Sequence, residues 1–501
     1  KAVRGNIFDR NQVQLTKNII HYSIGAHPKK ILKKEELSET LSNITGRDAE
    51  IYFNKLSSNR PFVTLEPKIK RELGEKVLEN LPNLIVERKS RRSYPHSNIA
   101  SQVIGFTNTD DSGLVGIERQ FEEYLSGKDG WIVKQVNVAG KTGSFHKANY
   151  PKQDPDDGSN IQLTIDLEYQ SILQEELQRR IDESGAKGAM GILMDPQNGD
   201  ILAMASLPDF DLNNPNITPL ENQKNKVITD QFEPGSTFKI VAATAALNTG
   251  KISLNDEFNC EVGKFEFDGW TISDHEKFGV LTFPQIIANS SNVGVIKIAQ
   301  IIGKEPLYRL SRNYGFGTPT GISFPGESQG ILRQKKDWSK MSLASVSIGY
   351  EVGVTALQIA SAYSAIANGG VLLKPQIVRQ IISNKGELLY KSKPEPIRKV
   401  VKAETMLIMK EILSKVINEG TGSKADVEGW SVAGKTGTAR KYMKGGYSKK
   451  YISNFAGFFP TENPRIVGVV MLDEPNYGLH WGGYGAAPLF KRIAQRIINL
   501  D

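Results

Sequence analysis

An apolar helical run that begins at a turn of small and polar residues is the feature that most constrains how this chain folds. Residues 233–239 (Glu-Pro-Gly-Ser-Thr-Phe-Lys) lead into residues 240–247 (Ile-Val-Ala-Ala-Thr-Ala-Ala-Leu). Such a run suits a helix in the protein core, around which the rest of the chain must fold. Gly235 permits a sharp turn at its start. We therefore predict a buried helix whose first turn carries Ser236.

Ser236 and Lys239 are three residues apart, so their side chains share one face of the predicted helix. A serine hydroxyl becomes a nucleophile when a base removes its proton, and a lysine is that base only if its pKa is lowered. The positive helix end disfavours a charge on Lys239, and its free N–H groups can hold an oxyanion. Because this spacing also occurs by chance, the pair alone leaves a capped surface helix as the alternative.

Two later motifs favour the catalytic interpretation. Ser290-Ser291-Asn292 lies between two apolar helical runs, where a solvated loop would explain the triplet equally well by itself. Lys435-Thr436-Gly437-Thr438 follows a strand-like run, and Gly437 has no side chain to block a ligand lying along that strand. Ser-x-x-Lys, Ser-x-Asn and Lys-Thr-Gly in this order form the motif set of penicillin-binding proteins and related β-lactamases.

Over nearly its whole length the chain resembles a class B penicillin-binding protein, a monofunctional peptidoglycan D,D-transpeptidase, and it most resembles the septal, division-type members. Outside the three motifs, the resemblance rests on residues 4–11, 116–118, 125–127, 347–350, 355–358, 367–370, 482–483 and 486–488.

The sequence pattern and the resemblance together predict an α+β fold. Residues 158–501 are expected to form a penicillin-recognising transpeptidase domain, an antiparallel sheet covered by helices with a helical lobe inserted between its halves. Residues 1–157 would form an elongated, mixed, non-catalytic pedestal or dimerisation-type domain. The turn-rich segment 151–159 marks the boundary. We also expect Arg4 or Arg10 to pair with Glu118 and so hold the start of the chain on the pedestal.

Periodicity predicts individual elements as well. The expected strands are residues 20–25, 161–165, 189–194, 201–205, 430–440, 451–459 and 465–472, and the expected helices are residues 68–81, 343–348, 355–366, 402–418, 488–500 and a helix that Asp166 caps. The Asn198-Gly199 pair between the strands at 189–194 and 201–205 is typical of a hairpin turn. Residues 251–280 form a loop-rich segment to which the sequence assigns no role.

The resemblance assigns a role to each motif residue. Ser236 would attack the carbonyl of the penultimate D-alanine of a peptidoglycan stem peptide, and Lys239 would take its proton. Ser290 would relay the proton to the leaving group, and Asn292 would hold the substrate amide. Lys435 would give a fixed positive charge for the terminal carboxylate and would disfavour a charge on Lys239.

The remaining motif residues would bind substrate. Thr436 and Thr438 would hydrogen-bond the carboxylate beside Gly437, and the N–H groups of Ser236 and Thr438 would form the oxyanion hole. β-Lactam antibiotics are expected to acylate Ser236. The alternatives are a D,D-carboxypeptidase or β-lactamase-type hydrolase, and a non-catalytic β-lactam sensor or scaffold.

Composition narrows the function classes. Lys and Arg number 63 against 55 Asp and Glu, but no basic block with interleaved aromatic residues indicates nucleic-acid binding. A single cysteine, Cys260, excludes an internal disulfide, and the six scattered histidines imply no metal. We expect no cofactor.

No run of about 18 apolar residues occurs. The resemblance nevertheless implies a single N-terminal anchor in the cytoplasmic membrane, absent from this sequence, with the catalytic domain on its outer side. It also implies a membrane-embedded glycan polymerase and other division proteins as partners.

Two motifs compete with this interpretation. Residues 429–436 match the phosphate-loop pattern G-x-x-x-x-G-K-T, but the surrounding residues favour a strand where that loop needs a helix. A second Lys-Thr-Gly at 141–143 precedes the serine in the sequence, so we interpret it as a hairpin of the non-catalytic part.

Overall fold

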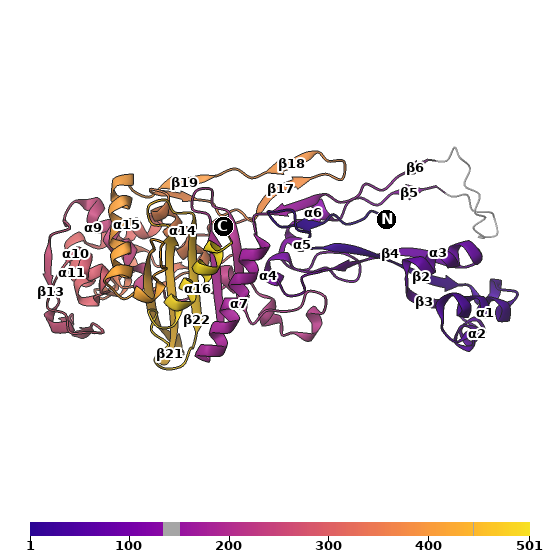
Figure 1. Ribbon diagram of the computed structural model, residues 1–501, viewed down its shortest axis with the longest axis horizontal. Helices are drawn as coiled ribbons and strands as arrows, with labels where there is room; N and C mark the ends of the chain where they lie inside the picture. The colour runs from indigo at the N-terminus through magenta and orange to yellow at the C-terminus, as the bar shows by residue number, and fades with distance from the viewer. Residues whose placement is uncertain (134–150, 444, 501) are drawn as a thin grey trace.

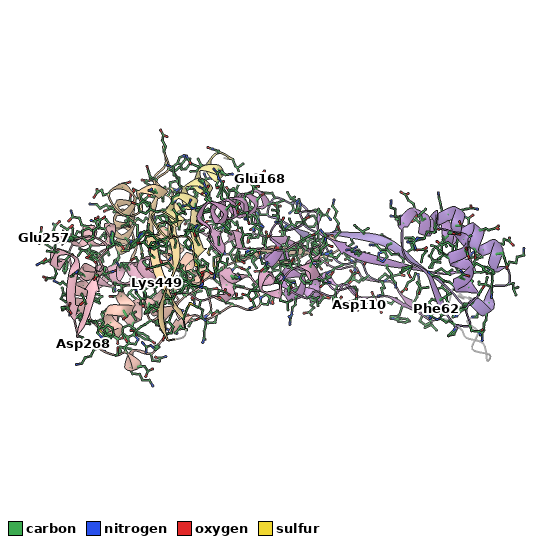
Figure 2. The ribbon with its side chains drawn as sticks, turned by 90° about the horizontal axis from the view of Figure 1, so that it is seen from below. Phe62, Asp110, Glu168, Glu257, Asp268 and Lys449 are labelled. Carbon is green, nitrogen blue, oxygen red and sulfur yellow. The ribbon has the colours of Figure 1, made fainter. Side chains whose placement is uncertain are left out.

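The protein is elongated, with a large sheet-and-helix domain at one end and a small head at the other (Figure 1). The computed structural model describes residues 1–133, 151–443 and 445–500. Figure 2 shows Phe62 in the head, and Glu257 and Asp268 at the opposite tip of the molecule. The second Lys-Thr-Gly, at 141–143, lies outside the described residues.

The head is a three-stranded antiparallel sheet with helices packed on it. Strand β2 (Lys17–Ala26) lies between β3 (Val63–Lys70) and β4 (Ile85–Ser93), and the helices are α1 (Lys34–Thr45), α2 (Ala49–Leu56) and α3 (Arg71–Asn80). The side chains that fill its core are fully buried: Ile24, Leu41, Tyr52, Leu56, Leu65 and Val77. The predicted strand at 20–25 is confirmed. The helix predicted from residue 68 starts only at Arg71, because Ile69 and Lys70 still pair with β2.

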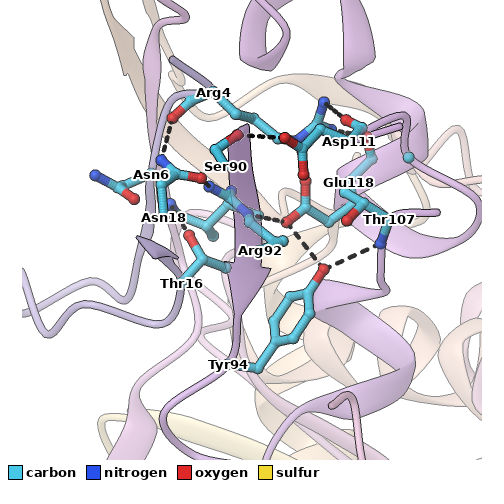
Figure 3. Close-up of polar contacts among 12 residues, drawn as sticks. Arg4, Asn6, Thr16, Asn18, Ser90, Arg92, Tyr94, Thr107, Asp111 and Glu118 are labelled. Atoms are coloured by element: carbon cyan, nitrogen blue, oxygen red, sulfur yellow. Dashed lines mark hydrogen bonds and ion pairs between the residues drawn. The ribbon is translucent and has the colours of Figure 1, made fainter. Parts of the chain in front are cut away.

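The region between the head and the large domain, which we call the neck, is held by a buried network of ion pairs (Figure 3). Glu118, on the short helix α5 (Gly116–Gln120), accepts hydrogen bonds from Arg4 Nε and Arg92 Nε, each 2.7 Å long. The expected partner of Glu118 is therefore Arg4, while Arg10 donates its backbone N–H to Ile165. The neck also contains α4 (Ser101–Ile104), α6 (Glu122–Leu125), β5 (Trp131–Ile132) and β6 (Lys152–Gln153).

A mixed sheet joins the start of the chain to the large domain. Strand β1 (Ile7–Phe8) pairs in parallel with β7 (Asn160–Leu163), which pairs with β17 (Val378–Ile382) and, beyond it, β18 (Leu388–Lys391). Asn11 also donates a hydrogen bond to Asp166, the predicted N-cap of α7 (Leu167–Ser184). The N-terminal residues are therefore tied directly to the large domain, and a boundary at residues 157 and 158 stays a prediction.

The large domain is built on a five-stranded antiparallel sheet, as predicted. Its order is β20 (Ala433–Met443), β21 (Gly446–Phe459), β22 (Ile466–Asp473), β8 (Gly188–Met194) and β9 (Ile201–Leu207). The predicted Asn-Gly turn joins β8 to β9, with Gly199 at φ 82°. Helices α7 and α16 (Ala486–Ile498) cover one face, and α14 (Ala356–Ala367) packs on the other. Strand β20 is an edge strand.

A helical lobe is inserted in the sequence between β9 and β20, also as predicted. Its centre is α9 (Lys239–Thr249), whose residues 239–246 are all buried. Around it lie α8 (Lys226–Thr229), α10 (Phe283–Ala288), α11 (Asn292–Ile302), α12 (Lys304–Asn313), α13 (Ser342–Ser347) and α15 (Ala403–Asn418).

Short strands complete the large domain. They are β10 (Glu257–Asn259), β11 (Lys264–Phe267), β12 (Trp270–Ser273), β13 (Val280–Thr282), β14 (Ile331–Leu332), β15 (Val352–Gly353), β16 (Val371–Leu373) and β19 (Pro396–Lys399). None of the helices in the described ranges is long and apolar enough to cross a membrane.

Candidate active site

Ser236 lies in a 3₁₀ turn, Gly235–Phe238, that runs directly into α9. The α-helix itself begins at Lys239, so the serine precedes the first α turn in which it was expected. Gly235 adopts a left-handed φ of 57°, and Thr237 Oγ1 donates a 3.0 Å hydrogen bond to the Pro234 carbonyl. These features turn the chain sharply and leave Ser236 partly exposed at the end of a buried helix.

The backbone around the serine is confined from two sides. A Cβ on Gly235 would lie 2.6 Å from the carbonyl oxygen of Thr438 on β20, and a Cβ on Gly349 would lie 2.1 Å from the carbonyl oxygen of Gly235. Neither position has space for a side chain. This packing sets the turn of Ser236 against the strand that carries the third motif.

Lys239 connects the first motif with the second. Its side chain is fully buried, and Nζ donates hydrogen bonds to the Ser290 carbonyl (2.6 Å), Ser290 Oγ (3.3 Å) and Asn292 Oδ1 (2.8 Å). In the described parts of the chain, no hydrogen bond joins this amine to Ser236. The lysine is thus oriented by the Ser-x-Asn motif.

Burial lowers the pKa of Lys239 to about 7, while the nearby Asp274 carboxylate acts in the opposite direction. A base with a pKa close to the working pH is present in its neutral form and still accepts a proton well. Burial, not the helix end or a like charge, is the largest cause, which the sequence argument had not anticipated.

The second motif occupies a tight junction between α10 and α11. Ser290 adopts a left-handed φ of 59° and is 9% exposed. Ser291 caps α11 by accepting a 2.9 Å hydrogen bond from the Gly294 N–H. Asn292 is the first residue of α11, and its Nδ2 donates to the Ser273 carbonyl at 2.9 Å. The triplet is therefore a structured helix start, and the solvated-loop alternative is wrong.

The third motif lies in the middle of β20. Lys435 is fully buried, and Thr436 and Gly437 are also buried, whereas Thr438 is partly exposed. The chain stays extended through Lys435 and Thr436, so these residues do not begin a helix and do not form a phosphate loop. Thr438 Oγ1 accepts a hydrogen bond from the Gly482 N–H at 2.9 Å.

Gly437 is also required by its protein neighbours, while the predicted room for a ligand stays a prediction. A Cβ at this position would lie 2.4 Å from the side chain of Asn454 on β21, and a Cβ on Gly482 would lie 2.5 Å from the Gly437 carbonyl. The absent side chain therefore makes room for protein neighbours.

The environment of Lys435 in the structure disfavours a charge on its amine. Burial holds the pKa of Lys435 well below the usual lysine value, and the charge of Lys239 lowers it further. Two buried amines near each other do not both stay protonated. Burial and the Lys239 charge thus both disfavour the charged form of Lys435, a bound carboxylate would favour it, and the role of Lys435 as a fixed positive charge stays a prediction.

Sequence reasoning missed Asp274 and His275, which lie in the segment 251–280 to which it assigned no role. Asp274 accepts hydrogen bonds from the second motif, and His275 makes a ring contact with Trp481, at a centroid distance of 6.3 Å. The one available signal was the Asp268-Gly269 pair, because Asp-Gly between β-prone runs is typical of a two-residue hairpin.

The fold and the three converging motifs define a serine transpeptidase of the penicillin-recognising type with an N-terminal accessory region. Residues 189–495 match the penicillin-binding protein transpeptidase domain, and residues 1–163 match the penicillin-binding protein dimerisation domain. The chain therefore belongs to the class B penicillin-binding proteins.

Named relatives extend over the whole chain. The probable peptidoglycan D,D-transpeptidase PenA of Neisseria meningitidis is 32% identical over 100% of this chain and 84% of the relative. Peptidoglycan D,D-transpeptidase FtsI of Escherichia coli is 31% identical over 99% of this chain and 83% of the relative. Penicillin-binding protein 3 of Mycobacterium tuberculosis, solved in complex with aztreonam, is 28% identical with a TM-score of 0.75, covering 100% of this chain and 96% of that one.

Proposed function

We propose that this protein cross-links peptidoglycan stem peptides through an acyl-enzyme on Ser236 and acts in septal wall synthesis. The observation that carries the proposal is the buried amine of Lys239, three residues after Ser236. Ser290 and Asn292 accept hydrogen bonds from this amine, and its pKa is lowered to about 7. This is the base that a serine nucleophile needs at neutral pH.

In the acylation step, Ser236 Oγ forms a bond with the carbonyl carbon of the penultimate D-alanine, and its proton passes to Lys239 Nζ. The bond to the terminal D-alanine then breaks, and Ser290 relays the proton from Lys239 to the departing amine, so that Lys239 is neutral again. An amine of a second stem peptide attacks the acyl-enzyme and restores the serine. Two easier steps thus replace one difficult step.

The substrate would lie along the edge strand β20. Thr436, Thr438 and Lys435 are assigned to its terminal carboxylate, Asn292 to its amide, and the N–H groups of Ser236 and Thr438 to the oxyanion. An oxyanion donor of this kind is worth roughly 3 kcal/mol in the transition state. The short approach between Gly235 and Thr438 supports the last assignment, because it brings the turn of Ser236 against the strand that carries Thr438.

β-Lactams are proposed to acylate the same serine, since they imitate the D-alanyl-D-alanine end. A relative of this chain has been solved in complex with aztreonam, which supports that reading. By family membership we also propose attachment to the cytoplasmic membrane through an N-terminal anchor, and action beside a membrane-embedded glycan polymerase and other division proteins.

The test is mass spectrometry of the intact protein after incubation with a penicillin, followed by peptide mapping. A stable adduct on Ser236, absent from Ser236→Ala with an unchanged melting temperature, is expected. Release of D-alanine from a stem-peptide donor that increases with an added amine acceptor identifies the transpeptidase. If D-alanine is released but water is the sole acceptor, the protein is a carboxypeptidase. If Ser236 is acylated and no D-alanine is released, the protein is a sensor. The absence of an adduct on Ser236 would overturn the proposal.

A further inference from the structure

A hairpin from the segment 251–280 reaches the second motif. Strands β11 and β12 are joined by Asp268 and Gly269, both with positive φ (47° and 81°), and Phe267 pairs with Trp270. A two-residue turn of this kind fixes the register of the two strands. Asp274 follows directly after β12, and its backbone N–H donates to the Gly263 carbonyl at 3.0 Å. The turn therefore determines where Asp274 lies.

The hairpin is fastened to α11 by Lys297. The Lys297 amine lies 4.9 Å from the centre of the Phe265 ring and donates hydrogen bonds to the Asn259 carbonyl (2.7 Å) and to Glu261 (2.6 Å). These contacts hold the hairpin and the helix as one unit, so Asp274 keeps a constant position at the start of α11.

Both carboxylate oxygens of Asp274 are used by the start of α11. Oδ1 accepts the backbone N–H groups of Asn292 (a short hydrogen bond) and Val293 (3.1 Å), and Oδ2 accepts the Ser291 hydroxyl at 2.7 Å. An anion that accepts free N–H groups at a helix N-terminus is strongly favoured there. Asp274 thus fixes the backbone of the residue whose side chain binds Lys239.

The Asn292 amide is held at both ends as a result. Its Oδ1 accepts from Lys239 Nζ, and its Nδ2 donates to the Ser273 carbonyl, the residue next to Asp274. One short segment, residues 273–274, therefore sets both the backbone and the side-chain orientation of Asn292. It is also the segment that brings a negative charge toward a buried amine.

We propose that Asp274 is a positioning residue of the transpeptidase reaction, which holds Asn292 in the orientation that binds Lys239 and places a negative charge near the Lys239 amine. The proposal rests on the proposed function of Ser236 and Lys239. Among the described residues, Asp274 makes no hydrogen bond to Ser236 or to Lys239, so it acts through Asn292 and through its charge.

Other charged or titratable groups also lie near the Lys239 amine. Lys435 and His275 face Lys239 from β20 and from the loop after β12, since the Lys239 charge lowers the pKa of both. The Cys260 thiol and the Lys297 amine also lie near Asp274. Lys297 forms an ion pair with Glu261. Among the charged groups in the described residues, the Asp274 carboxylate is the one that favours the charged form of Lys239.

Two substitutions separate the two parts of the role. Asp274→Asn keeps Oδ1 for both backbone N–H groups and removes the charge, while the Ser291 hydroxyl can turn to Cys260 Sγ, 3.5 Å away. Asp274→Ala removes charge and contacts together. Glu276→Gln, an exposed neighbour in the same loop, is the matched control.

The measurement is the second-order rate of acylation by a fluorescent penicillin between pH 5 and 9. Removing the anion lowers the pKa of Lys239, so in Asp274→Asn the acidic limb should move to lower pH by roughly half a pH unit or more. Asp274→Ala should show this shift and a plateau reduced about tenfold or more. Glu276→Gln should match the wild type. An unmoved limb in both variants, or equal plateaus in all proteins, would overturn the proposal.

A second readout does not depend on acylation. In Ser236→Ala, the NMR titration of the Lys239 side chain should move to lower pH when Asp274→Asn is added. If the wild type fails to acylate but this titration moves, the proposed function fails while the effect of Asp274 on Lys239 stands. If the wild type acylates and the titration does not move, the inference about Asp274 fails alone.

Discussion

Arg4 and Glu118, 114 residues apart in the chain, form a buried ion pair with 2.7 Å between Nε and Oε2. Arg92 takes the other carboxylate oxygen, also at 2.7 Å, so one buried anion holds two buried cations. The pair fastens the first residues of the chain to the neck of the pedestal (Figure 3).

Glu118→Ala should therefore destabilise the protein strongly. It leaves two buried guanidinium groups without their main partner, and breaking a buried pair in this way costs about 3–5 kcal/mol. Calorimetric unfolding measures the effect as a lowered melting temperature. Glu75→Ala is the control, since it breaks the exposed pair of Glu75 with Arg71 and should cost about 0.5 kcal/mol or less. Equal melting temperatures of the two variants would contradict the clamp.

Gly349→Ala should slow acylation although residue 349 belongs to none of the three motifs. Its Cβ would meet the Gly235 carbonyl at 2.1 Å and push the turn that carries Ser236. Gly369→Ala is a matched control, because Gly369 has nearly the same φ (84° against 85°) and nothing within 4 Å of its Cβ. Both variants should lose about 1–2 kcal/mol from backbone strain. Only Gly349→Ala should also lose acylation by a fluorescent penicillin, and equal rates would refute the steric argument.

The acylation rate should increase with pH and level off above pH 7. The pKa of Lys239 is lowered to about 7, and the neutral amine is the active form. Below that pH the neutral fraction of the Lys239 amine falls about tenfold per pH unit, so the acylation rate should fall tenfold per unit. Stopped-flow acylation across pH 5 to 9 measures the profile, and Lys239→Met should lose both the rate and the acidic limb. A flat profile would rule out Lys239 as the base.

Ser290→Ala should reduce acylation by about 10²–10⁴-fold, the usual contribution of a proton-transfer group. Its hydroxyl lies 3.3 Å from Lys239 Nζ, while the carbonyl that binds the same amine would remain. Ser364→Ala, which removes a buried hydroxyl that has no hydrogen-bond partner among the described residues, should leave the rate unchanged. Rapid-quench labelling gives both rates. If Ser290→Ala acylates at the wild-type rate, the proton moves by another route.

The catalytic core was predictable because its signals are local. The Ser236–Lys239 spacing, the apolar run of α9 and the strand-like runs of β20 to β22 each constrain a short piece of chain. The predicted Asn-Gly turn at 198–199 worked for the same reason. Arg4, chosen with Arg10 as a partner of Glu118, was confirmed by the geometry.

The features that were missed depend on partners distant in sequence. Ile69 and Lys70 belong to a stretch rich in Lys and Glu that suits a helix, yet pairing with β2 keeps them extended. The lowered pKa values of Lys239 and Lys435 follow from complete burial, which residue spacing alone does not report. Asp274 gained its role from a hairpin whose turn was visible in the sequence but whose docking on α11 was not.

The central strands of the catalytic sheet have a consequence for biosynthesis. Strand β8 pairs with β22, as in Ile192 with Val469, so nearly 300 residues must be added before β8 finds this partner. Every residue of β8 and β9 is buried in the finished protein. During synthesis the β8–β9 hairpin is therefore an apolar, half-paired surface, and pairing over such a separation closes slowly. The appearance of penicillin labelling in nascent or refolding chains would therefore report when the sheet is completed, because Ser236 lies against β20 only once β20 has joined the sheet.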